Sequence, residues 1–166
     1  MSTDPGRRWP VKILTVSDGV AAGTRLDRAG DVLATAAEEL GFEVVERRVV
    51  PDGTAAVADA LVEMTAGFTG LVLTTGGTGF GPRDLTPEGT RRVVERPAPG
   101  IAEAIRRASD AGGRGFGMLT RGEAGVVGGA LVCNLPGSAT GAEEGLRVIA
   151  PVVPHALELL HGGRPH

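Results

Sequence analysis

The sequence contains a single cysteine, no tyrosine and only 3% aromatic residues among its 166 positions. One cysteine cannot form an internal disulfide or supply a cysteine-ligated zinc site. The shortage of aromatic rings leaves little to stack the bases of single-stranded nucleic acid. Cys133 lies in an apolar run, so we expect it to be a small buried residue rather than a reactive thiol.

Long hydrophobic runs and an excess of basic charge are also missing. No segment approaches the roughly 18 apolar residues of a membrane helix, and the first ten residues lack the apolar core of a signal peptide. We therefore expect a cytoplasmic protein with no membrane partner. The formal net charge of −3 disfavours a nucleic-acid partner, so an anionic ligand must be met by local groups.

The length is that of one domain, which we assign to residues 11–162 between a disordered lead, residues 1–10, and a tail, residues 163–166. In the first half, short apolar runs alternate with helical patterns. Strands are expected at 11–17, 42–50 and 71–75, and helices at 29–40 and 54–66. This alternation predicts an α/β fold with a parallel sheet and right-handed crossovers.

The second half of the chain is expected to complete this sheet and its helices. Helices are expected at 86–95, with Thr86 as the N-cap, and at 100–109, and a further strand at 116–120. Gly128-Gly129 favours a tight turn between two antiparallel strands. Thr140 and Glu143 suit a capping box for a last helix, which Pro151 and Pro154 should kink or restart.

A glycine-rich segment, residues 74–84, follows the third expected strand directly. Such a turn at the carboxyl end of a parallel strand exposes backbone N–H groups that can bind phosphate, although glycine turns are also common as purely structural features. Arg83 and Asp84 stand close by, and a cation beside a carboxylate suits phosphate with magnesium. The sequence lacks the Gly-Lys-Ser/Thr of a P-loop and a Gly-x-Gly-x-x-Gly that opens a long helix, which disfavours those two nucleotide folds.

Other polar residues follow the ends of expected strands. Asp52 comes after the strand expected at 42–50, which we take to be adjacent to the strand at 71–75. It could join Asp84 in holding a hard cation, or could simply cap a helix. Ser17 and Asp18 end the first strand with the same ambiguity. Arg121 follows the expected strand at 116–120, at a loop tip where binding groups concentrate, and its alternative role is that of a solvated arginine. The segment 134–138 follows the hairpin and could equally be a plain proline–glycine turn.

The segment 73–88, Leu-Thr-Thr-Gly-Gly-Thr-Gly-Phe-Gly-Pro-Arg-Asp-Leu-Thr-Pro-Glu, together with 14–18, 50–52 and 134–138, resembles the MogA/MoaB family of molybdenum cofactor biosynthesis. The resemblance extends over about residues 11–160. It implies a three-layer αβα fold, usually trimeric, that adenylylates molybdopterin with ATP and magnesium and releases pyrophosphate. It also implies molybdopterin and ATP as ligands, and a molybdenum-insertion protein of the same pathway as a partner.

The resemblance assigns roles to particular residues. The two essential aspartates of the family match Asp52 and Asp84, which would also hold Mg²⁺. The nucleotide phosphates would be held by Thr75, Gly76, Gly77, Thr78, Gly79 and Arg83. The pterin and nucleotide pocket would be lined by Ser17, Asp18, Arg121, Pro136, Gly137 and Ser138.

Three positions depart from the pattern of the family. Ala29 and Thr120 stand where serine is common, and Ser138 stands where some members have asparagine or glutamine. The change at Ser138 resembles the MoaB branch, so the alternative function is a non-catalytic molybdopterin-binding protein of the same fold. The retained Asp52 and Asp84 favour an enzyme. A structural assembly module, the third interpretation, is disfavoured by the compact chain with no linker.

Overall fold

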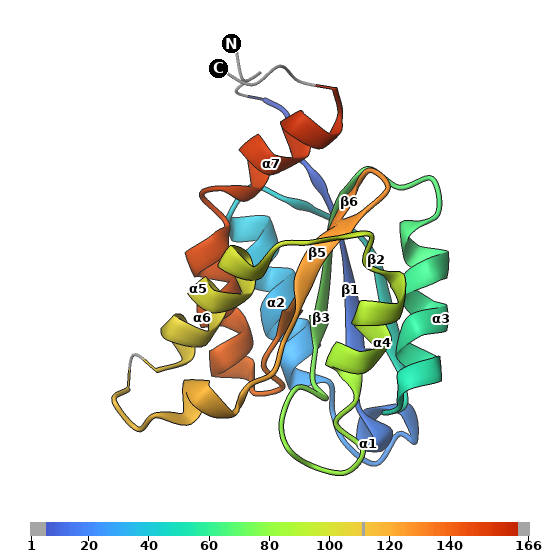
Figure 1. Cartoon of the computed structure of the whole chain (residues 1–166), viewed down its shortest axis with the longest axis vertical. Coiled ribbons are helices and arrows are strands. Elements are labelled where there is room, and N and C mark those ends of the chain that lie inside the picture. The colour runs from blue at the N-terminus through green and yellow to red at the C-terminus, as the bar shows by residue number, and fades with distance from the viewer. Residues whose placement is uncertain (1–5, 111, 163–166) are drawn as a thin grey trace.

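The computed structural model describes residues 6–110 and 112–162, in which six strands form one sheet of order β2-β1-β3-β6-β5-β4 (Figure 1). The strands span β1 Pro10–Val16, β2 Glu43–Val50, β3 Gly70–Thr75, β4 Arg96–Pro97, β5 Ala124–Val127 and β6 Ala130–Leu135. β1 pairs in parallel with β2 and β3, β3 pairs in parallel with β6, and β5 runs antiparallel to β6 and β4. The predicted mostly parallel sheet with an antiparallel hairpin is confirmed.

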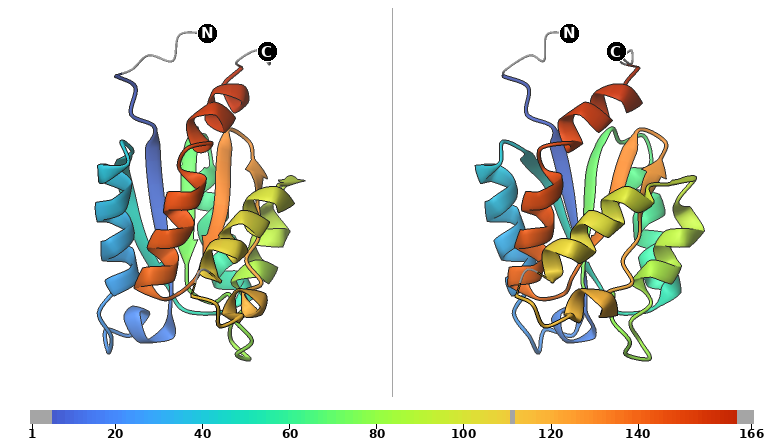
Figure 2. Two further views of the ribbon diagram at one scale, coloured as in Figure 1. Left: turned by 90° about the vertical axis from the view of Figure 1, so that its left-hand side faces the viewer. Right: turned by 60° about the vertical axis from the view of Figure 1, so that its left-hand side comes forward.

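Helices cover both faces of the sheet, which makes three layers (Figure 2). One face carries α2 Arg28–Glu39, α5 Pro99–Ser109 and α6 Ala139–Ile149, and the other carries α3 Thr54–Thr65 and α4 Thr86–Val93. The short α1, Asp18–Ala21, and α7, Val153–Leu160, lie at opposite ends of the sheet (Figure 1). In the part of the chain that the structure describes, no helix combines the length and apolarity required to cross a membrane.

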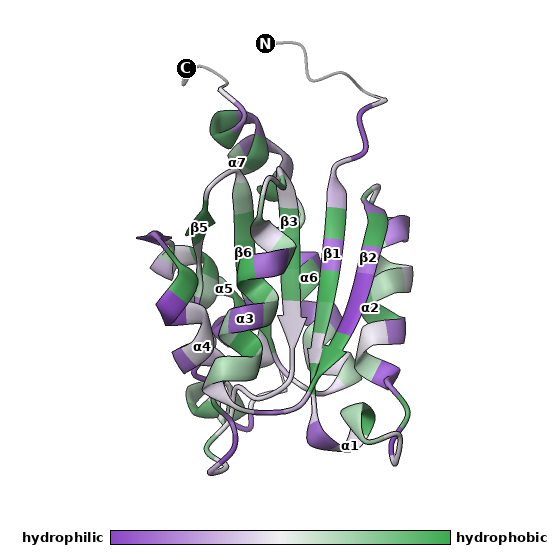
Figure 3. Cartoon of the chain, turned by 90° about the vertical axis from the view of Figure 1, so that its right-hand side faces the viewer, coloured by the Kyte–Doolittle hydropathy of each residue, from purple (hydrophilic) through white to green (hydrophobic). Residues whose placement is uncertain are grey.

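The central strands β1, β3 and β6 are largely apolar on both faces because each face has its own core (Figure 3). Successive side chains of a strand point to opposite faces, so neighbours enter different clusters. Ile13 and Leu73 pack into the larger cluster beneath α2, α5 and α6, whereas Leu14 and Val72 pack into the smaller one beneath α3. This double burial fixes the register of β1 and β3 and holds their carboxyl ends in place.

Cys133 lies in β6 and is fully buried in the larger cluster, as predicted. Burial raises the pKa of its thiol to about 12, because the thiolate would be desolvated there. The thiol is therefore protonated at neutral pH and cannot act as a nucleophile.

The expected strand at 116–120 is wrong: Phe116–Leu119 form a 3₁₀ helix, η1, preceded by Gly115 with a φ of 73°. The side chains of Phe116 and Met118 are 59% and 77% exposed, so the apolar pattern does not mark a buried strand. The capping box at Thr140 is also wrong, because Ser138 caps α6 by accepting from the Gly141 N–H at 3.1 Å.

The ordered chain begins earlier than predicted. Trp9 is 4% exposed, and its carbonyl accepts a hydrogen bond from the Glu43 N–H at 2.9 Å, one residue before β1 begins at Pro10. The predicted disordered lead is therefore wrong for Trp9 and Pro10, because the indole ring of Trp9 packs in the larger core cluster. Residues 1–5 and 163–166 lie outside the described part of the chain. The predicted interruption near Pro151 is confirmed, since α6 ends at Ile149 and α7 begins at Val153.

Candidate functional site

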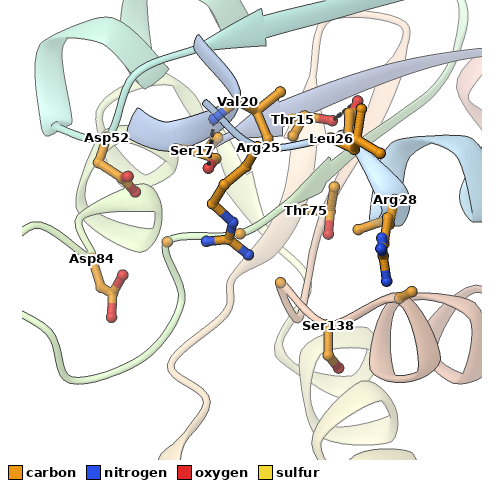
Figure 4. A pocket seen from close by; sticks show the side chains of 17 residues that line it. Thr15, Ser17, Val20, Arg25, Leu26, Arg28, Asp52, Thr75, Asp84 and Ser138 are labelled. Atoms are coloured by element: carbon orange, nitrogen blue, oxygen red, sulfur yellow. Dashed lines mark hydrogen bonds between the residues drawn. The ribbon is translucent and has the colours of Figure 1, made fainter. Parts of the chain in front are cut away.

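A cavity of about 740 Å³ lies at the carboxyl edge of the sheet, where β1, β3 and β6 end (Figure 4). This is the edge at which open α/β sheets bind ligands. Its walls are formed by Thr15, Val16, Ser17, Val20, Arg25, Leu26, Asp27, Arg28, Ala29, Asp52, Thr75, Gly76, Gly77, Asp84, Gly137, Ser138 and Ala139. The cavity thus brings together the ends of three strands and the loops that follow them.

The glycine loop, residues 76–81, turns sharply as it leaves β3. Gly76 and Gly77 have φ values of 98° and 66°, a region that residues with a side chain rarely adopt. Their carbonyls accept hydrogen bonds from the Thr86 hydroxyl at 2.8 Å and the Thr86 N–H at 3.0 Å. Among the described residues, the N–H groups of Gly77, Thr78 and Gly79 have no protein acceptor. The loop therefore keeps backbone donors available for an anion.

A buried chain of hydrogen bonds holds this loop from beneath. The Asn134 side-chain amide donates to the hydroxyls of Thr74 and Thr90, both at 2.9 Å, and the Thr90 hydroxyl donates to the Thr86 carbonyl at 2.8 Å. All four side chains are buried, and within the described chain no buried side-chain polar atom lacks a partner. A fully satisfied buried network of this kind rigidifies the backbone that it supports.

Asp52 is oriented by a reciprocal pair of hydrogen bonds with Asp18. The Asp18 N–H donates to the Asp52 carboxylate at 2.9 Å, and the Asp52 N–H donates to the Asp18 carboxylate at 3.1 Å. The interpretation of Asp52 as a helix cap is wrong, because Gly53 occupies the N-cap of α3 and no side chain caps it. The other Asp52 oxygen, Oδ1, would lie 3.2 Å from a β-carbon at Gly77, so the carboxylate lies against the glycine loop.

Asp84 reaches the same cavity from the loop after β3 (Figure 4). Its carboxylate accepts a hydrogen bond from the Gly81 N–H at 2.8 Å, and its own N–H donates to the Gly81 carbonyl at 3.0 Å. We expected the strands that precede Asp52 and Asp84 to be adjacent. This prediction is wrong, because β1 lies between β2 and β3. The length of the glycine-rich segment allows Asp84 to join Asp52 all the same.

Arg83 does not line the cavity. Its guanidinium donates to both Asp18 carboxylate oxygens, at 2.5 and 3.0 Å, and to the Asp52 carbonyl at 2.9 Å. The hydrogen bond from Arg83 lowers the pKa of the Asp18 carboxyl below its usual range. Arg83 and Asp18 therefore fasten the glycine loop to the loops that follow β1 and β2.

Arg121 likewise binds the protein itself rather than facing the cavity. Its guanidinium donates to the carbonyls of Gly79 and Asp84, at 2.9 and 2.6 Å, and to Glu88 at 2.5 Å. The pKa of the Glu88 carboxyl is lowered mainly by the hydrogen bond from Arg121. Arg121 thus holds the outer part of the glycine loop against the start of α4.

The remaining predicted residues divide into two groups. Thr75, Ser17, Gly137 and Ser138 line the cavity together with Gly76 and Gly77, whereas Thr78, Gly79, Asp18 and Pro136 do not. The Pro136 carbonyl accepts a hydrogen bond from the Thr75 hydroxyl at 2.7 Å. The turn at 136–138 is thereby fixed to the end of β3.

Three charged residues of the site, which lie in the loop after α1 and at the start of α2, were not predicted from the sequence. Asp27 caps α2 by accepting from the Gly30 N–H at 3.0 Å, and it also accepts from the Thr15 hydroxyl at 2.9 Å. Arg25 and Arg28 line the cavity, and neither guanidinium has a protein acceptor among the described residues. Their signal was the run of charges, Arg25-Leu-Asp-Arg28, in a loop that leaves a buried strand.

The donor set suits Mg²⁺. Asp52 and Asp84 supply two carboxylates to one cavity, and among the described residues no group of three or more histidine, cysteine or acidic side chains could hold a metal. Mg²⁺ commonly binds through one or two carboxylates, keeps several waters and takes further oxygens from substrate phosphates. The two aspartates beside the free amides of the glycine loop match that pattern.

Comparison with known proteins identifies the family and the fold. A family described as "Probable molybdopterin binding domain" matches residues 12–155. The molybdopterin adenylyltransferase of Pyrococcus furiosus is 34% identical over 150 residues, with 88% of each chain covered. The crystal structure of the molybdopterin biosynthesis enzyme MoaB from Thermus thermophilus is 42% identical, with a TM-score of 0.83, and the match covers 95% of this chain and 98% of that one.

A longer relative contains the same unit as one part. The molybdenum cofactor biosynthesis bifunctional protein of Synechococcus elongatus is 36% identical over 153 residues, which covers 90% of this chain and 47% of that protein. The chain thus spans about half the length of this relative. The family match over most of the chain, with the MoaB fold, confirms the resemblance seen in the sequence, and the chain belongs to the molybdopterin-binding domain family of molybdenum cofactor biosynthesis proteins.

Proposed function

We propose that the protein is a molybdopterin adenylyltransferase, which transfers the adenylyl group of ATP to the terminal phosphate of molybdopterin and releases pyrophosphate. One observation carries this proposal: Gly77, whose amide has no acceptor among the described residues, lines the same cavity as Asp52 and Asp84, and the amides of Thr78 and Gly79 follow it in the loop. A relative of similar length, from Pyrococcus furiosus, bears this name.

Different residues of the site have different roles in adenylyl transfer. The amides of Gly77, Thr78 and Gly79 bind phosphate oxygens and hold the α-phosphate in line with the attacking pterin phosphate. Asp52 and Asp84 would hold Mg²⁺, which neutralises charge on the phosphates when bound. The attacking phosphate oxygen is already an anion, so the reaction needs no general base.

We also propose that the protein acts in the cytoplasm as a homotrimer and passes its product to a molybdenum-insertion protein. The resemblance of the sequence to the family supports these assignments. The exposed apolar side chains of η1, Phe116, Met118 and Leu119, supply surface that a contact between subunits would bury.

The direct test is pyrophosphate release from Mg-ATP in the presence of molybdopterin. We expect release that depends on the pterin, together with a product whose mass has increased by one adenylyl group. A reaction without pterin gives the background of ATP hydrolysis. If the protein binds molybdopterin in calorimetry yet releases no pyrophosphate, from a pterin that a known adenylyltransferase accepts, then the non-catalytic alternative replaces this proposal.

A further inference from the structure

The two arginines first expected at the ligand site, Arg83 and Arg121, bind other protein groups, and two others, Arg25 and Arg28, line the cavity instead. Arg83 binds Asp18 and the Asp52 carbonyl, and Arg121 binds Glu88 and loop carbonyls. Arg25 carries no such partner among the described residues, and it lines the cavity. Figure 4 shows its guanidinium directed into the cavity, between the two aspartates and Ser138.

The backbone around Arg25 is fixed by the short helix α1. The N–H groups of Thr24 and Arg25 both donate to the Gly19 carbonyl, at 2.9 and 3.2 Å, and the Thr24 hydroxyl donates to the same oxygen at 3.1 Å. These bonds close the loop that follows α1 onto the helix itself. The Cα of Arg25 is therefore held in position although its side chain is exposed.

The aliphatic part of the Arg25 side chain lies over Gly19. A β-carbon at position 19 would come within 2.7 Å of Cδ and 3.0 Å of Cγ of Arg25. The absence of a side chain at Gly19 lets the arginine lie across α1 with its guanidinium over the cavity. The direction of the side chain thus depends on a glycine in the helix beneath it.

We propose that Arg25 binds a phosphate group of the substrate in this cavity, an inference that rests on the proposed function. A guanidinium with free N–H donors binds phosphate through charge-assisted, often bidentate, hydrogen bonds. Its positive charge also offsets part of the negative charge of the two carboxylates that share the cavity, Asp52 and Asp84. ATP and molybdopterin both carry phosphate, so the shared ligand is the phosphate group itself.

The test compares the affinities of wild type and Arg25→Met for ATP, adenosine and molybdopterin by calorimetry. Methionine keeps the length of the aliphatic chain and removes the charge. We expect a loss of roughly tenfold or more in affinity for at least one phosphate-bearing ligand. Adenosine, which has no phosphate, should bind both proteins equally, and Arg25→Lys should fall between them. Arg92→Met, on the exposed side of α4 and away from the cavity, is the matched control.

A double-mutant cycle tests the role of Gly19. Gly19→Ala should displace the side chain of Arg25 and lower the same affinity, and it should have little further effect in the Arg25→Met protein. A loss confined to ATP places Arg25 on the nucleotide, and a loss confined to molybdopterin places it on the pterin phosphate.

The proposal is overturned if Arg25→Met binds both phosphate ligands as wild type does, if adenosine affinity falls as much as ATP affinity, or if wild type binds neither phosphate ligand. The adenylyltransferase assignment fails separately. In that case wild type releases no pyrophosphate, while the affinities of wild type and Arg25→Met for the phosphate ligands still decide the role of Arg25.

Discussion

Replacing Asp84 with asparagine is expected to lower the rate of pyrophosphate release by roughly a hundredfold or more, and Asp52→Asn should do the same. A bound metal ion contributes several kcal/mol of charge stabilisation to the transition state, and each 1.36 kcal/mol is tenfold in rate. Both carboxylates line one cavity, and one Asp52 oxygen accepts no protein hydrogen bond among the described residues. The rate is measured from pyrophosphate release at saturating Mg-ATP and molybdopterin.

The fold should survive these changes because asparagine retains a side-chain oxygen. That oxygen can still accept the N–H of Asp18 at position 52, or the N–H of Gly81 at position 84. Asp59→Asn is the matched control, because Asp59 is exposed on α3 and does not line the cavity. Wild-type rates in both site variants, at every Mg²⁺ concentration, would remove the aspartates from the mechanism.

Gly77→Ala should lower pyrophosphate release by roughly a hundredfold, as the loss of a positioned transition-state donor does. A methyl group there would lie 2.3 Å from the Thr86 hydroxyl and 3.2 Å from Oδ1 of Asp52, so the loop or the aspartate must move. The φ of 66° adds strain of about 1 to 3 kcal/mol. The rate of pyrophosphate release and the thermal unfolding midpoint are both measured for Gly77→Ala and for wild type.

Gly41→Ala is the control that separates the effect of backbone strain from the effect of a steric clash. Gly41 has a φ of 87°, and a β-carbon there meets nothing within 4 Å. This variant should lose stability as Gly77→Ala does but keep its rate of pyrophosphate release. Equal rates in the two glycine variants would show that the shape of the loop around Gly77 does not matter for the reaction.

The elements of the fold could be predicted largely from local patterns. β1 and β3 are largely buried on both faces and are short, mostly apolar runs, and Gly128-Gly129 marks the hairpin turn between β5 and β6. The segment 116–120 was mistaken for a strand because its apolar side chains are exposed, and exposure depends on the tertiary structure. β4, only two residues long, gives no periodic signal.

The site was partly predictable for a similar reason. Asp52 and Asp84 could be placed at one edge because parallel strands end there together, although the order of the strands could not be read from the sequence. The roles of the arginines could not be predicted, because each depends on which acceptors the folded loops bring near it. Arg83 binds Asp18 and Arg121 binds Glu88, whereas Arg25 lines the cavity.

The arginines and aspartates together show how a chain with a net charge of −3 could bind the anions of the proposed reaction. Arg83 and Arg121 neutralise Asp18 and Glu88 and hold the glycine loop in shape, and the loop then offers its amides to the ligand. Under the proposed function, binding would depend on these local groups and not on overall charge.

The most direct test of this account is a crystal structure of the protein with Mg²⁺ and a non-hydrolysable ATP analogue. The account predicts phosphate oxygens within hydrogen-bond distance of the amides of Gly77, Thr78 and Gly79, and the metal beside Asp52 or Asp84. Phosphates bound elsewhere, with these amides facing solvent, would contradict it.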